Sequence, residues 1–418
     1  MLILLFCLLT TLDLFADDYP PGTIQLTPQL DLGLEPVPVE GLPGRTVKLP
    51  TGFRIKLFSK NVDHGRFMAF DDDEVLHLAN MNTHDYGYWK NSYKRNGSVL
   101  AFPDKDGDGH ADRAYLAADQ FLHPHSIAFY KGQLYVADHD TIYRLYDRDG
   151  DGYYEERSDF IEVPGIMGRP SEHVTHSLVF DEANDKLYLH VGSGCDVCRE
   201  DDPERATILE FNADGSGRRI YASGLRNAIG IDLHPLTGQL WACGNGHDRA
   251  GTQLPPEWIN IVRRGSFHGW PFTYAYRVWI DFSDKEYARK VGPITSADSA
   301  LVQDVERPIA LVGAHLAPMG LHFYSRDQFP SQYQNAAFVA FHNGVGNPDH
   351  PGYKVSVLFS EPDGRNARIA DFLTGFHRKN KGYWALPVGV ISDSKGHLYV
   401  SSDRITPAIF RIEYDPED

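Results

Sequence analysis

Two short acidic segments of the chain have the residue types and the spacing to bind calcium. They read DKDGDGHAD and DRDGDGYYEE, and each follows the pattern DxDxDGxxD/E. Alternate carboxylates offer hard oxygen ligands, and the glycine after the third aspartate permits the sharp turn of such a loop. The expected ligands are Asp104, Asp106, Asp108 and Asp112 in the first segment and Asp147, Asp149, Asp151 and Glu155 in the second. The last, bidentate glutamate of an EF-hand is missing, so an acidic surface turn without an ion is the alternative interpretation.

A second group of polar residues stands shortly before apolar runs. His173 precedes the run HSLVF, and Arg226 and Asn227 open the segment RNAIGI. A histidine can accept a proton from a hydroxyl group near neutral pH, and a guanidinium can bind a carboxylate with two hydrogen bonds. Alone, such a histidine more often has a structural role, and such an arginine more often forms a salt bridge. The elements that carry them therefore decide whether they form a site.

The segment CDVC contains Cys195 and Cys198 and is a CxxC motif. Attachment of a c-type haem would require a histidine after the second cysteine, and Arg199 stands there instead. If the protein is exported to an oxidising compartment, the two cysteines are in a setting that permits a local disulfide.

The elements that would position these residues form a repeat. Six units each contain an apolar strand, a turn and a second strand of the type LYV, and most are spaced by roughly 50 residues, with a longer gap before the fifth. Long amphipathic helical patterns are missing, which disfavours α/β folds. The pattern predicts an all-β, six-bladed β-propeller, with a pair of sandwiches or a β-helix as alternatives. The units begin near RFMAF, HSIAF, HSLVF, AIGID, MGLHF and VGVIS.

In a propeller the first strand of every blade lines a central channel, so residues at the starts of these strands meet at one mouth. His173, the pair Arg226 and Asn227, and His315 all stand at or shortly before such starts. Polar residues from several blades can therefore build one shared site.

Several motifs in order along the chain resemble a known family. They are SGLRNAIGI, GNGHD, PPEWIN, GSFHGWP, LAPMGLHFY and LPVGV. Each is weak alone, but their joint order is similar to that of the soluble PQQ-dependent glucose and sorbosone dehydrogenases, a family related to pyranose dehydrogenases. The resemblance runs from about Gly52 to the C-terminus. It implies a six-bladed propeller that oxidises sugars or other polyols with pyrroloquinoline quinone (PQQ), held over a calcium ion at the channel mouth.

The resemblance also implies roles for individual residues. His173 matches the base that removes the hydroxyl proton as hydride passes to the quinone, and Arg226 and Asn227 match the pair that contacts the cofactor. Gly246 and His247 match two positions whose backbone carbonyls bind the calcium beside the cofactor. The chemistry agrees, because a guanidinium pairs with the carboxylates of PQQ and an amide can donate to a quinone oxygen.

Two further expectations follow from the same resemblance. His315, in GAHLAP, matches a family histidine and is expected near the cofactor, at the rim of the substrate site. Cys195 and Cys198 match a CxxC of the sorbosone-type branch, which implies a short disulfide that shapes the loop beside His173 rather than a redox centre.

One departure from the family pattern removes a charge. Leu386, in ALPVG, stands where the family has an arginine on the cofactor. Arg226 then becomes the main expected counter-charge for PQQ, and Lys354 or Arg404 is the candidate replacement for the lost arginine. The other departures are HNGVG from residue 342 in place of His-Gly-Ser-Trp, and His247-Asp248 in place of Arg-Asp.

Composition and charge exclude other classes. The chain has 418 residues, 42% of them hydrophobic, and a net charge of −17 without any block rich in lysine and arginine, so nucleic-acid binding is not expected. Residues 1–16, MLILLFCLLTTLDLFA, resemble a secretory signal peptide that is too short to span a bilayer. Residues 17–51 form a proline-rich lead and residues 52–418 the propeller. A periplasmic or secreted protein without a membrane span is expected.

The leading hypothesis is an exported PQQ-dependent dehydrogenase that oxidises a sugar or a related polyol or aldehyde and passes the electrons to a separate acceptor. The first alternative is a propeller that has lost the cofactor and binds carbohydrate or another partner, and Leu386 is its main support. The second is a calcium-dependent, lactonase-like propeller hydrolase. It would need several acidic or amide side chains at the mouth, where the sequence places arginine and histidine.

Overall fold

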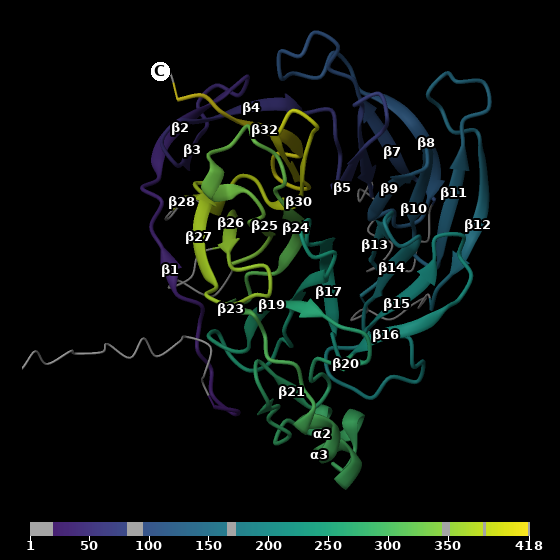
Figure 1. Ribbon diagram of the computed structural model, residues 1–418, viewed down its shortest axis with the longest axis vertical. Helices are drawn as coiled ribbons and strands as arrows, with labels where there is room; N and C mark the ends of the chain where they lie inside the picture. Colours follow the sequence, from purple (N-terminus) through teal and green to yellow (C-terminus); the bar gives the residue numbers. More distant parts are fainter. Residues whose placement is uncertain (1–19, 82–94, 165–172, 345–351, 379–381, 417–418) are drawn as a thin grey trace, which may run out of the picture.

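The computed structural model describes residues 20–81, 95–164, 173–344, 352–378 and 382–416. The expected signal peptide therefore lies outside the described part of the chain. Six antiparallel sheets are arranged around a central channel as the blades of a β-propeller (Figure 1). The sequence-based prediction of an all-β, six-bladed propeller is confirmed.

The inner strands of the six blades form a closed ring, because each contacts the inner strands of both neighbouring blades. These strands begin at one end of the channel, the mouth, and end at the other, the far end. In blade order they are β5 (Gly65–Phe70), β9 (Ser126–Tyr130), β13 (His176–Asp181), β17 (Asn227–Leu233), β24 (Pro318–Phe323) and β30 (Pro387–Ser392).

The remaining strands of each blade follow outward in antiparallel order. Blade one adds β6 (Leu76–Asn80), β7 (Gly97–Phe102) and β8 (Tyr115–Phe121). Blade two adds β10 (Gln133–Ala137), β11 (Thr141–Tyr146) and β12 (Glu156–Glu162). Blade three adds β14 (Lys186–Val191), β15 (Thr207–Asn212) and β16 (Arg219–Ser223). Blades four and five add β18 (Leu240–Asn245), β19 (Pro256–Val262) and β23 (Ala310–Ala314), and β25 (Ala337–Phe341), β26 (Lys354–Phe359) and β27 (Arg368–Leu373). Buried apolar residues fill the spaces between neighbouring blades.

Blade six closes the ring with a strand from the other end of the chain. Its outer strand β4 (Phe53–Ser59) pairs with β32 (Ala408–Tyr414), which follows β31 (Leu398–Ser402), and Figure 1 shows the purple β4 beside the yellow β32. The lead segment packs on the same region. Its strands β2 (Glu35–Glu40) and β3 (Thr46–Leu49) extend this sheet, and β1 (Gln29–Leu30) pairs with β27 of blade five.

An apolar cluster lies on the inner strands between the two ends of the channel. Ile229, Met319 and Val388 come from three successive inner strands, and Phe67 from β5 packs against them. The strands approach closely at Gly320, where a Cβ atom would lie 2.7 Å from the backbone oxygen of Val388. The two ends of the channel can therefore hold separate sites.

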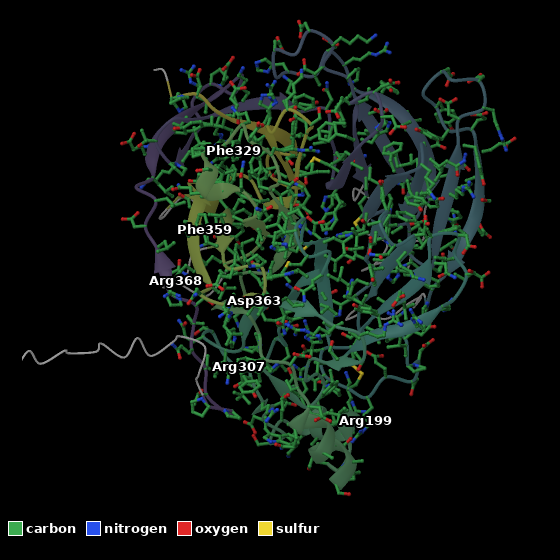
Figure 2. The ribbon with its side chains drawn as sticks, in the orientation of Figure 1. Arg199, Arg307, Phe329, Phe359, Asp363 and Arg368 are labelled. Atoms are coloured by element: carbon green, nitrogen blue, oxygen red, sulfur yellow. A yellow bond between two sulfur atoms is a disulfide. The ribbon has the colours of Figure 1, made fainter. Side chains whose placement is uncertain are left out.

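A helical segment that the sequence analysis did not predict occupies the long gap before the fifth unit. It contains α2 (Lys285–Val291) and α3 (Ser296–Gln303), after the short strands β20 (Ser266–Phe267), β21 (Thr273–Tyr274) and β22 (Val278–Trp279). Arg199 donates to both carboxylate oxygens of Asp298 in α3, at 3.0 and 2.7 Å, and Figure 2 labels Arg199 beside these helices. Within the described residues, no helix is both long and apolar enough to cross a bilayer.

Candidate functional site at the channel mouth

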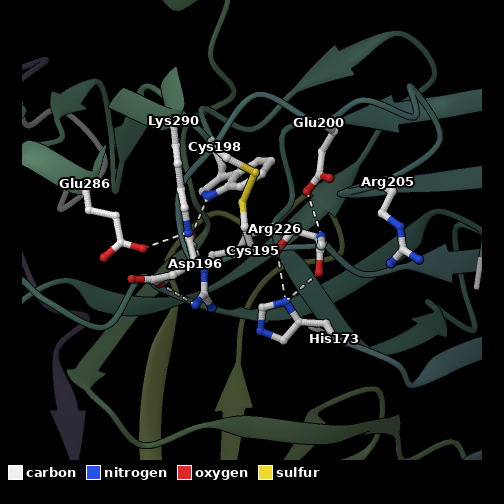
Figure 3. The surroundings of a disulfide bond; sticks show 12 residues. His173, Cys195, Asp196, Cys198, Glu200, Arg205, Arg226, Glu286 and Lys290 are labelled. Carbon is white, nitrogen blue, oxygen red and sulfur yellow. Dashed lines mark hydrogen bonds and ion pairs between the residues drawn. A yellow bond between two sulfur atoms is a disulfide. The ribbon is translucent and has the colours of Figure 1, made fainter. Parts of the chain in front are cut away.

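Backbone hydrogen bonds bring the segments around His173, Ser193 and Arg226 side by side at the mouth. The N–H of His173 donates to the carbonyl of Ser193 at 3.1 Å, and the N–H of Ser193 donates to the carbonyl of Arg226 at 2.8 Å. Ser193 follows β14, and Arg226 directly precedes β17. Two neighbouring blades therefore place these side chains at one site, as Figure 3 shows for His173 and Arg226.

The protonation of His173 follows from its neighbours. The hydroxyl of Ser193 donates to the carbonyl of Cys195 at 2.7 Å, so its oxygen is an acceptor for Nδ1 of His173 at 2.9 Å. This assigns the proton to Nδ1 and leaves the lone pair on Nε2, which forms no hydrogen bond within the described residues. Burial, and then the charge of Arg226, lower the pKa of His173 to about 3. The imidazole is therefore neutral near pH 7.

Arg226 is ion-paired inside the protein rather than free at the mouth. Its Nη2 lies 2.8 Å from Oδ1 of Asp196, its Nε donates to the carbonyl of Asp196 at 3.1 Å, and its Nη1 donates to the carbonyl of Asn245 at 3.4 Å. The side chain is 6% exposed. The backbone φ of 53° places Arg226 in the left-handed region, which turns the chain immediately before β17.

Asp196 holds this corner together and was missed by the sequence analysis, although it lies inside CDVC. The structure joins Cys195 and Cys198 by a disulfide, and Asp196 lies in the loop that it closes (Figure 3). Besides Arg226, the carboxylate accepts hydrogen bonds from the hydroxyl of Tyr287 in α2 and from the backbone of Asp248. Burial alone would raise the pKa of Asp196, but Arg226 and Tyr287 hold it below its usual value.

Asn227 keeps one polar atom without a partner. Its Nδ2 donates to Oδ1 of Asn245 at 3.2 Å, whereas its own Oδ1 is buried and has no hydrogen-bond partner among the described residues. Gly192 lies between Asn227 and His173, because a Cβ atom there would be 3.1 Å from that oxygen and 2.5 Å from Cβ of His173. The unpartnered oxygen is therefore adjacent to the histidine.

A second charged cluster lies across the mouth, between blades six and one, and is centred on the buried Asp403. Arg66, at the start of β5, donates to this carboxylate at 2.8 Å, and Nε2 of His342 lies 3.0 Å away. His64 and Arg404 approach it to 3.3 and 3.8 Å. Burial opposes ionisation, but His342, Arg66 and His64 hold the pKa of Asp403 well below its usual range. The sequence analysis missed Arg66 and Asp403.

This cluster bears on the missing family arginine. Leu386 is buried in the core of blade six, and its carbonyl accepts the N–H of Asp403 at 3.4 Å. Arg404, one of the two candidate replacements, is therefore close to Leu386, and Arg66 is a further cation there. Lys354, the other candidate, instead pairs with Asp371 at 2.6 Å.

The two positions expected to bind calcium beside the cofactor follow β18. The N–H of Gly246 donates to the buried carboxylate of Glu257 at 2.6 Å, and burial raises the pKa of Glu257 to about 7. The ring of His247 is buried against Tyr274 and Tyr287. His315 is half-buried, and its Nε2 lies 2.7 Å from the carbonyl of Gly251. Gly246, His247 and Glu257 belong to blade four, the blade that begins after Arg226, and His315 lies in the connection from β23 of this blade to β24 of the next.

The two acidic loops lie away from the mouth, because they join the third and fourth strands of blades one and two. In each loop the structure brings three carboxylates together, with ligand atoms within 4.8 Å of one another: Asp104, Asp106 and Asp108, and Asp147, Asp149 and Asp151. The fourth expected ligands, Asp112 and Glu155, accept backbone N–H groups of Lys105 and Arg148. Arg411 lies 3.5 Å from Asp104 in the first loop.

Comparison with known proteins places this architecture in a family. Residues 47–415 match the TrAA12-like family. An uncharacterized protein of Borreliella burgdorferi is 25% identical over 88% of this chain and 91% of its own. The holo form of the PQQ domain of pyranose dehydrogenase from Coprinopsis cinerea shares the fold, with a TM-score of 0.69 and 20% identity over 90% of this chain and 99% of that one.

A second solved structure shares this fold. The calcium structure of a Trichoderma reesei enzyme of carbohydrate-active family AA12 has a TM-score of 0.69 and 17% identity, and the match covers 88% of this chain and 97% of that one. The family match spans most of the chain, and both solved structures share its fold over nearly their whole length. The protein described here therefore belongs to the TrAA12-like family.

Proposed function

We propose that this protein is an oxidoreductase that uses PQQ to oxidise a hydroxyl or aldehyde group of a sugar or a related polyol. The observation that carries the proposal is the neutral His173, whose Nε2 lone pair is unbonded next to Arg226 and Asn227. Membership of the TrAA12-like family and the likeness to the holo PQQ domain of a pyranose dehydrogenase support it. Export and a separate electron acceptor belong to the same proposal.

The groups at the mouth fit PQQ in kind. The buried Oδ1 of Asn227 lacks a hydrogen-bond donor, which a bound ligand or an ordered water can supply. Arg226 makes three hydrogen bonds to Asp196 and Asn245, so its five N–H groups leave donors for a carboxylate of the cofactor. Arg66 and Arg404 would provide positive charge near Leu386, where the family arginine is missing.

His173 would act as the general base. When bound, PQQ supplies the two-electron oxidant that accepts hydride from the substrate carbon. Nε2 of His173 receives the hydroxyl proton, while Ser193 keeps Nδ1 protonated and the ring in one orientation. Because burial and Arg226 disfavour the charged imidazole, the ring holds this proton weakly, and its loss regenerates the base for the next turnover.

Calcium belongs to the proposal at two kinds of site. The backbone carbonyls of Gly246 and His247 would hold an ion next to the cofactor, and the acidic loops would hold structural ions away from it. A calcium structure of an AA12 relative supports the choice of ion. The second loop, built on Asp147, is the better structural site, because Arg411 already supplies positive charge beside Asp104 in the first.

The test is reconstitution of the purified protein with PQQ and calcium. We expect quinone absorbance to appear on the protein, and reduction of a redox dye with at least one member of a panel of aldoses and sugar acids. His173→Ala should bind PQQ but lose turnover by about 100-fold or more, the usual contribution of a general base. His110→Gln, which changes a histidine in the first acidic loop, should leave turnover unchanged.

Two results would contradict the proposal. A lack of spectral change at micromolar PQQ would mean that the protein does not bind this cofactor. It would favour the carbohydrate-binding alternative, which agrees with the internal pairing of Arg226 with Asp196. If turnover survives in His173→Ala, the protein is still a dehydrogenase, but His173 is not its general base.

A further inference from the structure

The far end of the channel contains a cavity of about 340 Å³ that is separate from the mouth. All six inner strands line it, and the apolar cluster of Ile229, Met319 and Val388 lies on these strands between the cavity and the mouth. A strand rises about 3.3 Å per residue, so the five steps from Asn227 to Asp232 in β17 place the two sites about 16 Å apart. A volume of this size accommodates a small organic molecule.

Three polar residues meet in this cavity at the ends of three successive inner strands. Asp232 belongs to β17, His322 to β24 and Ser392 to β30, and all three line the cavity. Nε2 of His322 lies 2.8 Å from Oγ of Ser392, and its Nδ1 lies 3.4 Å from Oδ2 of Asp232. The order of groups is therefore hydroxyl, imidazole, carboxylate.

The tautomer of His322 follows from the hydrogen bonds around it. The backbone N–H of Ser392 donates to Nε2 of His322 at 3.2 Å, so this nitrogen carries the lone pair and Nδ1 carries the proton. The protonated Nδ1 is the nitrogen near Asp232. The lone pair on Nε2 also lies beside the hydroxyl of Ser392. A histidine in this tautomer can take a proton from a serine.

Asp232 is held in place for this arrangement. The N–H groups of Leu233 and Phe323 each donate to its carboxylate at 2.8 Å. Its side chain is 23% exposed and that of His322 is 19% exposed, so both are accessible from the cavity without being on the open surface. The carboxylate can therefore orient His322 and stabilise the imidazolium that forms when the ring accepts a proton.

We propose that Ser392, His322 and Asp232 form a second catalytic site that cleaves small uncharged carboxylic esters. Oγ of Ser392 attacks the ester carbonyl and its proton passes to Nε2 of His322. The bond to the alcohol then breaks, the alcohol takes that proton, and an acyl-serine remains. Water attacks the acyl group and gives a proton to Nε2 of His322. The bond from the acyl carbon to Oγ then breaks, His322 passes this proton to Oγ, and the acid and free Ser392 are released.

The charges around the cavity favour an uncharged substrate. Among the described lining residues the acidic side chains are Glu74, Glu182 and Asp232, and Arg326 is the single cation. A substrate that carried a free carboxylate besides its ester group would meet more negative than positive charge in the cavity. Arg326 is exposed at the rim and is the group that can approach the oxyanion of the reacting carbonyl.

The proposal is independent of PQQ and of the mouth, and its test uses neither. The purified protein is treated with an alkyl fluorophosphonate, which phosphonylates an activated serine: the P–F bond breaks, an O–P bond forms and fluoride leaves. We expect the label on Ser392 at pH 7.5, located by peptide mass spectrometry, at the same rate with and without added PQQ. A lack of label on Ser392 in the folded protein would overturn the proposal.

Variants test the roles of the three residues. His322→Gln retains an acceptor for the N–H of Ser392 but cannot take a proton, so its labelling rate should fall by about 100-fold or more. Asp232→Asn should lower the rate less. Ser394→Ala is the matched control, since this serine lines the same cavity and makes no hydrogen bond to His322, and its rate should equal that of the parent. Labelling of His322→Gln at the parental rate would overturn the role of the histidine.

Turnover supplies a second readout. Hydrolysis of p-nitrophenyl butyrate should be lost in Ser392→Ala and retained in Ser394→Ala, with thermal unfolding measured on both to establish that they are folded. Equal hydrolysis by the parent and a folded Ser392→Ala would overturn the proposal, because the activity would then arise elsewhere. A loss of dye reduction with PQQ, by contrast, would bear only on the function proposed for the mouth.

Discussion

Arg226 and Arg66 at the mouth are each paired with a carboxylate from a distant part of the chain, and these pairs set the electrostatics of single residues there. Arg226 is bound to Asp196, and Arg66 to Asp403. Removing one partner of a buried pair leaves the other charge without compensation, which is more damaging than the small net contribution of the intact pair suggests. Ligands that approach the mouth therefore meet ordered N–H donors more than net positive charge.

A titration of His173 tests this arrangement at the scale of one residue. Arg226→Ala removes a cation that disfavours the imidazolium and leaves the negative Asp196 nearby, and both changes favour protonation. The pKa of His173 should therefore rise from about 3 toward its ordinary range. In ¹⁵N-detected NMR titrations of the apoprotein, the ring should stay neutral at pH 5 in the parent and titrate between pH 4 and 7 in the variant.

The control for this titration is Arg148→Ala, in the second acidic loop, which should leave the pKa of His173 unchanged. An unchanged pKa in Arg226→Ala as well would mean that burial alone keeps the ring neutral. Arg226 would then not be a reason why the imidazole holds its proton weakly.

Of the two charged pairs at the mouth, the sequence predicted one member of the first, Arg226, and neither member of the second. Arg226 drew attention because a charged residue opens an apolar strand, and His173 because it stands before one. Asp403 and Arg66 are 337 residues apart and meet only because the last blade closes on the first. Asp196 lies within CDVC, where the two cysteines account for the motif and nothing in the pattern singles out the residue between them. Pairing between distant side chains is a property of the folded ring and has no local pattern.

At the scale of elements, strands were predictable and the helices were not. Each blade repeats an apolar strand and a turn, so the pattern recurs along the chain. The helices α2 and α3 are 7 and 8 residues long, which is too short for a clear helical period, and they occur once. Tertiary contacts support them instead, above all the bond between Arg199 and Asp298 and the hydroxyl of Tyr287 on Asp196.

Asp298→Ala should loosen this helical segment without unfolding the propeller. The carboxylate accepts hydrogen bonds from Arg199 and from the backbone and hydroxyl of Thr295, in the capping box of α3. Loss of a cap costs about 1 kcal/mol locally, and the exposed side of the ion pair adds little. Amide hydrogen exchange in residues 285–303 should become faster while the blades keep their protection. Leu301→Ala, on the exposed side of α3, is the control and should change neither.

At the scale of the whole molecule, the N-terminal strand β4 joins the two ends of the chain. It is the outer strand of blade six, whose other three strands come from the C-terminus. The number of blades followed from the repeat, but the sequence analysis began the propeller at residue 52 without predicting which blade that strand completes. Register between the first and last strands depends on ring closure, which periodicity does not encode.

Phe53, at the start of β4, provides the test of this closure. Its side chain is 3% exposed and its ring packs against Phe329 at 4.8 Å and Phe372 at 5.0 Å, so it ties the closing strand to blade five as well as to blade six; Figure 2 labels Phe329 in this region.

Phe53→Ala removes these contacts and leaves a cavity, and we expect the free energy of unfolding to fall by about 4 kcal/mol. Because the strand completes the ring, the loss should appear in a single unfolding transition of the whole propeller, measured by urea denaturation with fluorescence and circular dichroism. Leu236→Ala, at a side chain that is 65% exposed, should change the same free energy by no more than about 0.5 kcal/mol. If Phe53→Ala costs as little as this control, the ring is closed by the β4–β32 backbone pairing alone, and the aromatic cluster contributes nothing to it.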